Sequence, residues 1–163
     1  MPLVLCDASA TVKRFVIETG TSVMKALFDA VTPEELWTTM IGYSETFAIL
    51  WRRHNGGVIN RKTFVAATSS LETIFLRGAN VPLEMDNVSV MKSLGMIQKH
   101  NLNSTDAVIL TLYLQLLQKS GRKDAVLVTV DHRLLRAAQA EGLATLDPTN
   151  FDENDLPEFL ANL

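Results

Sequence analysis

Two hydrophobic patterns alternate along the chain, and together they predict a mixed α/β protein. Short continuous apolar runs predict buried strands at Leu3–Cys6 and Ala125–Val130, and strand composition extends to Glu35–Ile41 and Leu143–Leu146. Between them, apolar residues recur at helical spacing, which predicts helices over 8–18, 22–31, 44–54, 60–76, 85–100, 104–120 and 131–140. Strands that alternate with helices favour a mostly parallel sheet.

Acidic residues stand where this pattern places the functional edge of such a sheet. Asp7 and Asp131 each follow a predicted strand, and ligands of open α/β sheets bind beyond the carboxyl ends of the strands. Asp106 is expected in the first turn of a helix capped by Ser104 or Thr105. Glu45 is expected in the first turn of the helix that Ser44 would cap. Helices begin at the edge where strands end, so the four carboxylates are predicted to converge.

Each of these acids, taken alone, also has a purely structural interpretation. Asp7 and Asp131 suit the N-cap positions of the helices that follow them. Asp106 and Glu45 suit first-turn positions beside the positive end of a helix dipole. Taken jointly, four carboxylates at one edge repel each other and require a cation. Oxygen-only ligands predict Mg²⁺ or Mn²⁺, since zinc would require His or Cys at a suitable spacing.

Composition and charge narrow the function classes. The 163 residues fit one domain, and no apolar stretch reaches the length of a membrane span. The single cysteine, Cys6, lies in an apolar run and is expected to be a buried hydrophobe in a reducing cytoplasm; we expect no secretory signal. Net charge is −3, but residues 147–158 carry five acids and no base, so the remainder is +2. No GxxxxGK[ST] or GxGxxG motif supports a nucleotide site.

Four segments resemble the motifs of the PIN-domain family, and within it the VapC-type toxin ribonucleases of toxin–antitoxin pairs. The matching segments are LCDASATVKRFVIETG (5–20), SETFAILWRR (44–53), LNSTDAVILTLYL (102–114) and LVTVDHRLLRAAQAEGL (127–143). Each contains one of the four acids. The resemblance covers about residues 2–148, and the first, third and fourth motifs carry most of its specificity.

The resemblance implies a three-layer α/β/α fold and an Mg²⁺- or Mn²⁺-dependent endoribonuclease that cleaves single-stranded RNA. It also implies a small antitoxin as partner and commonly a homodimer. Asp7, Asp106 and Asp131 would hold the metal, while Glu45 would hold metal or orient the attacking water. The expected division is a PIN-like domain over 1–148 and an acidic tail over 149–163.

Further residues have expected supporting roles. Ser9 and Thr129 are candidates to hydrogen-bond a carboxylate or a water, although each taken alone is more simply a cap or strand residue. Lys13, Arg52 and Arg133 are candidate phosphate-binding residues. No Ser–His–Asp set is indicated.

Two other functions remain open from the sequence. A PIN-like scaffold could bind RNA or protein without cleaving it, and an Mg²⁺-dependent phosphatase could use another α/β fold. The phosphatase would normally have a DxD-like run, where this chain has Asp7-Ala8-Ser9. The tail could fold over a basic groove or be a solvated terminus, and the loose nature of chain ends favours the second.

Overall fold

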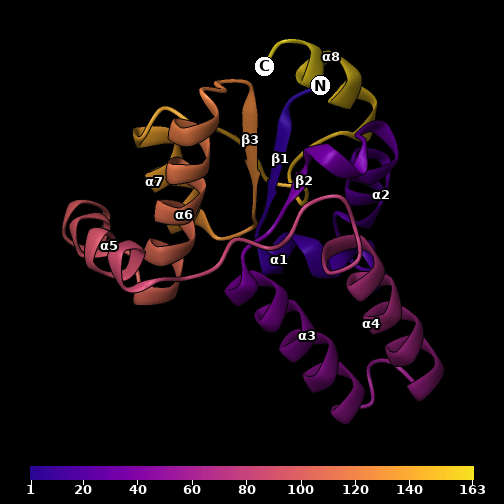
Figure 1. Cartoon of the computed structure of the whole chain (residues 1–163). Coiled ribbons are helices and arrows are strands. Elements are labelled where there is room, and N and C mark those ends of the chain that lie inside the picture. Colours follow the sequence, from indigo (N-terminus) through magenta and orange to yellow (C-terminus); the bar gives the residue numbers. More distant parts are fainter.

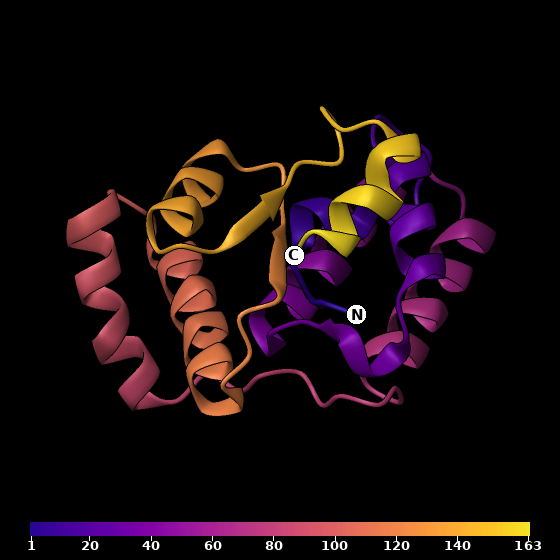
Figure 2. The same ribbon diagram turned by 90° about the horizontal axis from the view of Figure 1, so that it is seen from above.

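A four-stranded parallel sheet forms the centre of the protein in the computed structural model, which describes residues 1–163. The strand order is β2-β1-β3-β4, with β1 (Leu3–Cys6), β2 (Leu36–Trp37), β3 (Ala125–Val128) and β4 (Ala144–Leu146). Helices cover both faces, as Figures 1 and 2 show. The predicted three-layer α/β/α class with a parallel sheet is therefore confirmed.

The helices divide into two groups, one on each face of the sheet (Figure 2). One group comprises α1 (Ala8–Thr11), the 3₁₀ turn η1 (Val12–Arg14), α2 (Thr21–Ala30), η2 (Pro33–Glu35), α3 (Met40–Asn55), α4 (Arg61–Phe75), η3 (Glu153–Asp155) and α8 (Leu156–Ala161). The other comprises α5 (Asn87–His100), α6 (Ser104–Ser120) and α7 (His132–Ala140). None of these helices is long and apolar enough to cross a membrane.

Both faces of the two central strands are buried, which explains their continuous apolar runs. In β1, Val4 and Cys6 point into the core shared with α2, α3, α4 and α8. Leu3 and Leu5 point into the core shared with α6 and α7. Successive side chains of a strand alternate between faces, so a strand covered on both sides must be apolar at every position. Cys6 is fully buried, as expected of a small core residue.

The third strand-like segment is much shorter than predicted, because local hydrogen bonds end it early. Glu35 and Thr32 form a capping box around the turn η2, which occupies the start of the expected strand. Thr39 then caps α3 by accepting from the Gly42 amide at 2.9 Å, so this helix starts at Met40. Ser44 is therefore not the cap, and Glu45 lies one turn further into the helix than predicted.

The first helix is also shorter than the predicted 8–18. It ends at Thr11, whose hydroxyl donates to the Asp7 carbonyl at 2.7 Å, and continues only as the turn η1. The chain then reverses at Gly20, where φ is +91°. A side chain at Gly20 would lie 2.7 Å from the Pro148 carbonyl oxygen, so both the conformation and the close approach favour glycine.

The acidic tail is folded, which corrects the expectation of a solvated terminus. Leu156 and Leu160 of α8 are 2% and 5% exposed and belong to the core that contains α2. Figure 1 places α8 near the N-terminus, at the opposite end of β1 from α1. The tail therefore does not fold over the edge where Asp7 lies. Sequence periodicity missed this helix because it is only six residues long.

Candidate metal-binding and active site

Strand register brings residues of three segments to one edge of the sheet. Cys6 pairs with Val128, and Val128 pairs with Leu146. The next residues along the three strands therefore stand side by side at the carboxyl ends of the strands, and they are Asp7, Thr129 and Asp147. Asp131 follows two residues later, because β3 ends at Val128 rather than at the predicted Val130.

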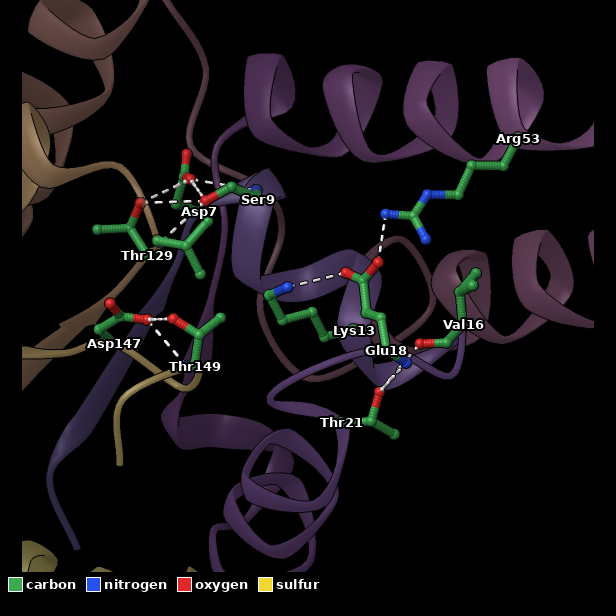
Figure 3. A network of polar contacts seen from close by, with 11 residues as sticks. Asp7, Ser9, Lys13, Val16, Glu18, Thr21, Arg53, Thr129, Asp147 and Thr149 are labelled. Carbon is green, nitrogen blue, oxygen red and sulfur yellow. Dashed lines mark hydrogen bonds and ion pairs between the residues drawn. The ribbon is translucent and has the colours of Figure 1, made fainter. Parts of the chain in front are cut away.

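Asp7 is held in one orientation by three hydrogen bonds to the same carboxylate oxygen. Its Oδ2 accepts from the Ser9 amide at 3.1 Å, the Ser9 hydroxyl at 2.5 Å and the Thr129 hydroxyl at 2.9 Å (Figure 3). The residue is 6% exposed, and Thr129 is fully buried. The other oxygen, Oδ1, has no hydrogen-bond partner in the protein, so it is available to a ligand.

Ser9 and Thr129 also tie Asp7 to the segment that carries Asp131. The Ser9 hydroxyl accepts from the Val130 amide, and the Thr129 hydroxyl accepts from the Asp131 amide, both at 3.1 Å. One continuous network thus joins the ends of β1 and β3. The carboxylate contact considered for Ser9 and Thr129 from the sequence is present for both.

Asp131 combines a capping role with a free oxygen. Its Oδ1 accepts from the amides of Arg133 at 2.8 Å and Leu134 at 3.0 Å, which caps α7. Oδ2 has no partner in the protein. Asp7 likewise caps α1 through the Ser9 amide. The capping interpretation is therefore correct for both residues, and it leaves one oxygen of each carboxylate unoccupied.

Asp106 lies in the first turn of α6, as predicted, although Asn103 rather than Ser104 or Thr105 is the cap. Its Oδ2 accepts from the Asn103 side-chain amide at 2.7 Å. Burial, together with the negative charges of Asp7 and Asp131, raises the pKa of Asp106 to about 6. This carboxylate is thus in an environment that disfavours its ionised form.

Glu45 approaches the same place from α3. It is partly buried and makes no hydrogen bond within the protein. Burial raises the pKa of Glu45, and the charges of Asp7 and Asp106 raise it further, whereas Arg52 acts in the opposite direction. Asp7 and Asp106 are therefore near enough to Glu45 to oppose its ionisation, despite its corrected position in the helix.

The donor chemistry of this site fits a hard divalent cation. Asp7, Asp106 and Asp131 each keep one oxygen free of protein hydrogen bonds, and Glu45 keeps both. Hard cations prefer such oxygen ligands. As the side chains lie, however, no group of three or more His, Cys, Asp or Glu residues is arranged to hold a metal ion. These acids therefore interact electrostatically, but they do not form a preformed coordination shell for a metal ion.

Two of the three predicted phosphate-binding residues are exposed beside the carboxylates. Arg52 and Arg133 are exposed, and their charges favour the ionised forms of Glu45 and Asp106 respectively. Lys13 differs, because it is only 8% exposed and its Nζ lies 2.9 Å from Glu18 Oε1 (Figure 3). Its charge is therefore already paired within the protein.

Glu18 is the centre of this ion-pair cluster. It also pairs with Arg53 of α3, and the Thr21 hydroxyl accepts from its amide at 2.9 Å. Burial alone would raise the pKa of Glu18, but its hydrogen bonds with Lys13 and Arg53 outweigh burial and lower it. The cluster joins η1 to α3, so Lys13 has a structural role that its sequence position did not indicate.

Asp147 is a further acid at this edge, which the sequence analysis counted only among the acids of residues 147–158 and did not include in the site. It follows β4 directly, as Asp7 follows β1, and this position was the signal that could have identified it. Burial would raise the pKa of Asp147, but hydrogen bonds from Thr149 and Asn150 and the nearby His132 lower it. His132 therefore lies near Asp147, a relationship that the sequence did not suggest.

The protein is similar to known proteins in structure, although not detectably in sequence. No protein-family model matches the sequence, and no curated protein is significantly similar to it. The fold is similar to a chain of FitAB, whose structure was solved bound to an IR36 DNA fragment, with a TM-score of 0.66 and 15% identity. It is also similar to PAE2754 from Pyrobaculum aerophilum, with a TM-score of 0.58 and 20% identity. The alignments cover 92% and 99% of this chain and 98% of either neighbour.

Proposed function

From the premise that this chain has the VapC-type PIN-domain fold, as its sequence motifs predicted and its structural neighbours support, we propose that it is a metal-dependent endoribonuclease. The proposed reaction is Mg²⁺- or Mn²⁺-dependent cleavage of single-stranded RNA. The proposed biological role is the toxin of a toxin–antitoxin pair.

One observation carries the proposal: carboxylates from four separate elements influence one another electrostatically at the carboxyl edge of the sheet. Burial raises the pKa of Asp106, and the charges of Asp7 and Asp131 raise it further. Burial likewise raises the pKa of Glu45, and the charges of Asp7 and Asp106 add to it. Repulsion of this kind destabilises the fold unless a cation compensates it. A site that keeps such repulsion is typical of function rather than of stability.

A bound ion would be held by Asp7, Asp106 and Asp131, directly or through water, with Glu45 nearby. Mg²⁺ usually retains several waters, so it can be shared by carboxylates that do not form a closed shell. When bound, such an ion supplies an activated water and stabilises negative charge on a phosphate undergoing substitution.

The protein's own residues would perform the remaining steps. Ser9 and Thr129 hold the Asp7 carboxylate through Oδ2, which would leave Oδ1 free for the ion. Glu45 makes no hydrogen bond that would lower its pKa. Its raised pKa suits it to accept a proton from water at a carboxylate oxygen. Arg52 and Arg133 are exposed and would contact phosphate groups of the RNA.

The proposal includes a small antitoxin as protein partner, on the strength of the VapC-type motifs and the FitAB-like fold. It also includes a homodimer, which light scattering of the purified protein would test. We place the protein in the cytoplasm. The alternative function is a PIN-like scaffold that binds RNA or protein without cleavage. It has no use for mutually repelling carboxylates, and that observation favours the nuclease.

The decisive experiment incubates purified protein with a mixed RNA pool in Mg²⁺, Mn²⁺ or EDTA. We expect fragments with either metal and none in EDTA. Asp7→Asn should abolish cleavage while RNA binding and thermal stability persist. Asp155→Asn is the matched control, because Asp155 is exposed on η3 and its side chain makes no hydrogen bond. Cleavage by Asp7→Asn at the wild-type rate would refute the assignment, and intact binding without any cleavage would support the scaffold.

A further inference from the structure

Glu141, the C-cap residue of α7, joins the end of that helix to the end of α5. Its Oε1 accepts hydrogen bonds from Lys99 Nζ at 2.8 Å and from His100 Nε2 at 2.5 Å. These hydrogen bonds outweigh partial burial and lower the pKa of Glu141, so the carboxylate is ionised at neutral pH. Hydrogen bonds to an ionised acceptor are stronger than neutral ones, and more so where water is excluded.

The two partners of Glu141 differ in how far they are shielded from water. The side chain of Lys99 is 60% exposed, and exposed ion pairs contribute little to stability. The side chain of His100 is only 9% exposed, and that of Glu141 is 17% exposed. His100 is also the last residue of α5. The contact between His100 and Glu141 therefore fixes the point at which the chain leaves α5.

The turn that follows His100 has little conformational freedom. It comprises only Asn101, Leu102 and Asn103, and α6 begins directly after it. Asn101 has a left-handed backbone conformation, with φ at +53°. Leu102 is 4% exposed in the core shared with α6 and α7. We therefore expect a displacement of His100 to move Asn103 rather than to be absorbed by the turn.

Asn103 holds Asp106 through both its backbone and its side chain. The Asn103 Oδ1 accepts from the Asp106 amide at 2.8 Å, and the Asn103 side-chain amide donates to Asp106 Oδ2 at 2.7 Å. The Asn103 carbonyl also accepts from the Ala107 amide at 3.0 Å. The place of Asn103 thus determines the orientation of the Asp106 carboxylate.

We infer that Glu141 is a positioning residue of the carboxylate site and acts on Asp106 through His100 and Asn103. Asp131 is the N-cap of α7 and Glu141 is its C-cap, so the helix joins the two residues rigidly. The contact with His100 then ties the start of α6 to α7, which keeps Asp106 and Asp131 at a constant separation. A metal ion shared by these two carboxylates depends on that separation.

The effect on metal binding rests on the proposed function, whereas the link from Glu141 to Asp106 can be measured in the metal-free protein. Amide hydrogen exchange followed by NMR measures it. In Glu141→Ala we expect the amides of Asp106 and Ala107, which donate to Asn103, to exchange about tenfold faster than in wild type. The Leu110 amide, in the middle of α6, should be unaffected. Glu141→Gln should restore most of the protection, because its amide oxygen can still accept a hydrogen bond.

Mn²⁺ titration then tests the effect on the site. Glu141→Ala should raise the apparent Kd for Mn²⁺ by about threefold to tenfold, and Asn103→Ala should raise it at least as much. If Glu141 acts through Asn103, the double variant should bind Mn²⁺ no more weakly than Asn103→Ala alone. Glu72→Ala, which breaks the ion pair with Arg77 on the other side of the molecule's sheet, is the matched control and should change neither exchange nor Kd.

Three results would overturn the inference. The first is unchanged exchange of Asp106 and Ala107 in Glu141→Ala. The second is an equal rise in exchange over the whole domain, which would make Glu141 an ordinary stabilising residue. The third is a double variant whose loss of Mn²⁺ affinity equals the product of the two single losses, because Glu141 and Asn103 would then act independently. Failure of the proposed nuclease would appear separately, as a wild type that neither binds Mn²⁺ nor cleaves RNA, and the exchange rates alone would then decide the link to Asp106.

Discussion

The Tyr113 hydroxyl donates a 2.7 Å hydrogen bond to the carbonyl of Cys6, the residue that immediately precedes Asp7. Tyr113 is fully buried, and it lies seven residues after Asp106 on the same face of α6. The helix that carries one carboxylate is thus fixed to the strand end that carries another. This contact sets the spacing between Asp7 and Asp106.

Tyr113→Phe should therefore reduce metal binding more than it reduces stability. The change removes one hydrogen bond and leaves the carbonyl with only the weaker donor Thr38 at 3.4 Å, which should cost about 1 kcal/mol of unfolding free energy. We expect the apparent Mn²⁺ affinity and the cleavage rate to fall together. Urea unfolding and Mn²⁺ titration measure the two effects.

Thr111→Val is the matched control on the same helix. Thr111 is 5% exposed and donates to the Ala107 carbonyl at 2.7 Å, but it makes no hydrogen bond with a residue of the site. We expect a comparable loss of stability with unchanged Mn²⁺ affinity. Equal Mn²⁺ affinity of Tyr113→Phe and wild type would show that the contact is only structural.

Thr129→Val tests the network that orients Asp7. Valine has nearly the shape of threonine but cannot donate to Asp7 Oδ2 or accept from the Asp131 amide. Loss of such an outer hydrogen bond typically lowers metal affinity or activity by about 10–100-fold. Cleavage kinetics over a range of Mg²⁺ concentrations would show it as a higher metal requirement. Ser93→Ala, which removes another buried hydroxyl on α5, should leave that requirement unchanged.

Asp106→Asn should stabilise the protein while it abolishes cleavage. The pKa of Asp106 is raised from 3.8 to about 6 in the folded protein, so the folded state binds the proton more tightly than the unfolded chain. Its contribution to stability is complete below pH 3.8 and is lost as the pH rises through 6. Above that pH, asparagine should raise the unfolding free energy by roughly 1–2 kcal/mol, after allowance for partial solvent screening.

The unfolding free energy measured at pH 4 and at pH 8 tests whether the ionised Asp106 carboxylate destabilises the folded protein. The stabilisation by Asp106→Asn should be present at pH 8 and small at pH 4. Mg²⁺ should stabilise wild type and not the variant, because a ligand that binds only the folded state raises its stability. A variant less stable than wild type at pH 8 without metal would contradict the proposed repulsion.

The strands and their acids were predictable because their signals are local. A continuous apolar run followed by Asp is visible in β1, and strand direction then determines the edge at which Asp7 lies. Parallel pairing and the three-layer arrangement follow from the alternation of elements. The long helices α4 and α6 were also found from periodicity and from glycine at their ends.

What the sequence did not reveal depends on contacts between distant residues. The role of Lys13 is set by Glu18 and by Arg53 of another helix, and the sequence contains no sign of that pairing. The start of α3 depends on which of two nearby hydroxyl residues caps it. In the structure Thr39 is the cap, whereas the sequence analysis expected Ser44. The proximity of Asp147 to the site depends on the register of β4.

Lys13 and Arg133 should therefore behave differently on mutation. Lys13→Met leaves Glu18 with one partner and should cost roughly 1–3 kcal/mol of stability, as expected for a charge-assisted hydrogen bond. Arg133→Gln alters an exposed residue and should leave stability unchanged. It should weaken RNA binding and lower the slope of log affinity against log salt by about 0.7, the value for one single-strand phosphate contact. Binding measured in the Asp7→Asn background avoids cleavage. If Lys13→Met changed the salt slope more than Arg133→Gln does, Lys13 would be an RNA contact after all.

Leu156→Ala should destabilise the whole domain and leave RNA affinity unchanged, because α8 packs into the core that contains α2 and lies away from the carboxylate edge. Leu156 is 2% exposed, and truncation of such a core leucine typically costs about 2–5 kcal/mol. Leu94→Ala is the control, since Leu94 is 46% exposed on α5 and its loss should change stability by about 0.5 kcal/mol or less. Urea unfolding compares the two variants. If a protein that lacks residues 149–163 remained equally stable and bound RNA more tightly, the tail would be an inhibitory segment and its packing on α2 would contribute little.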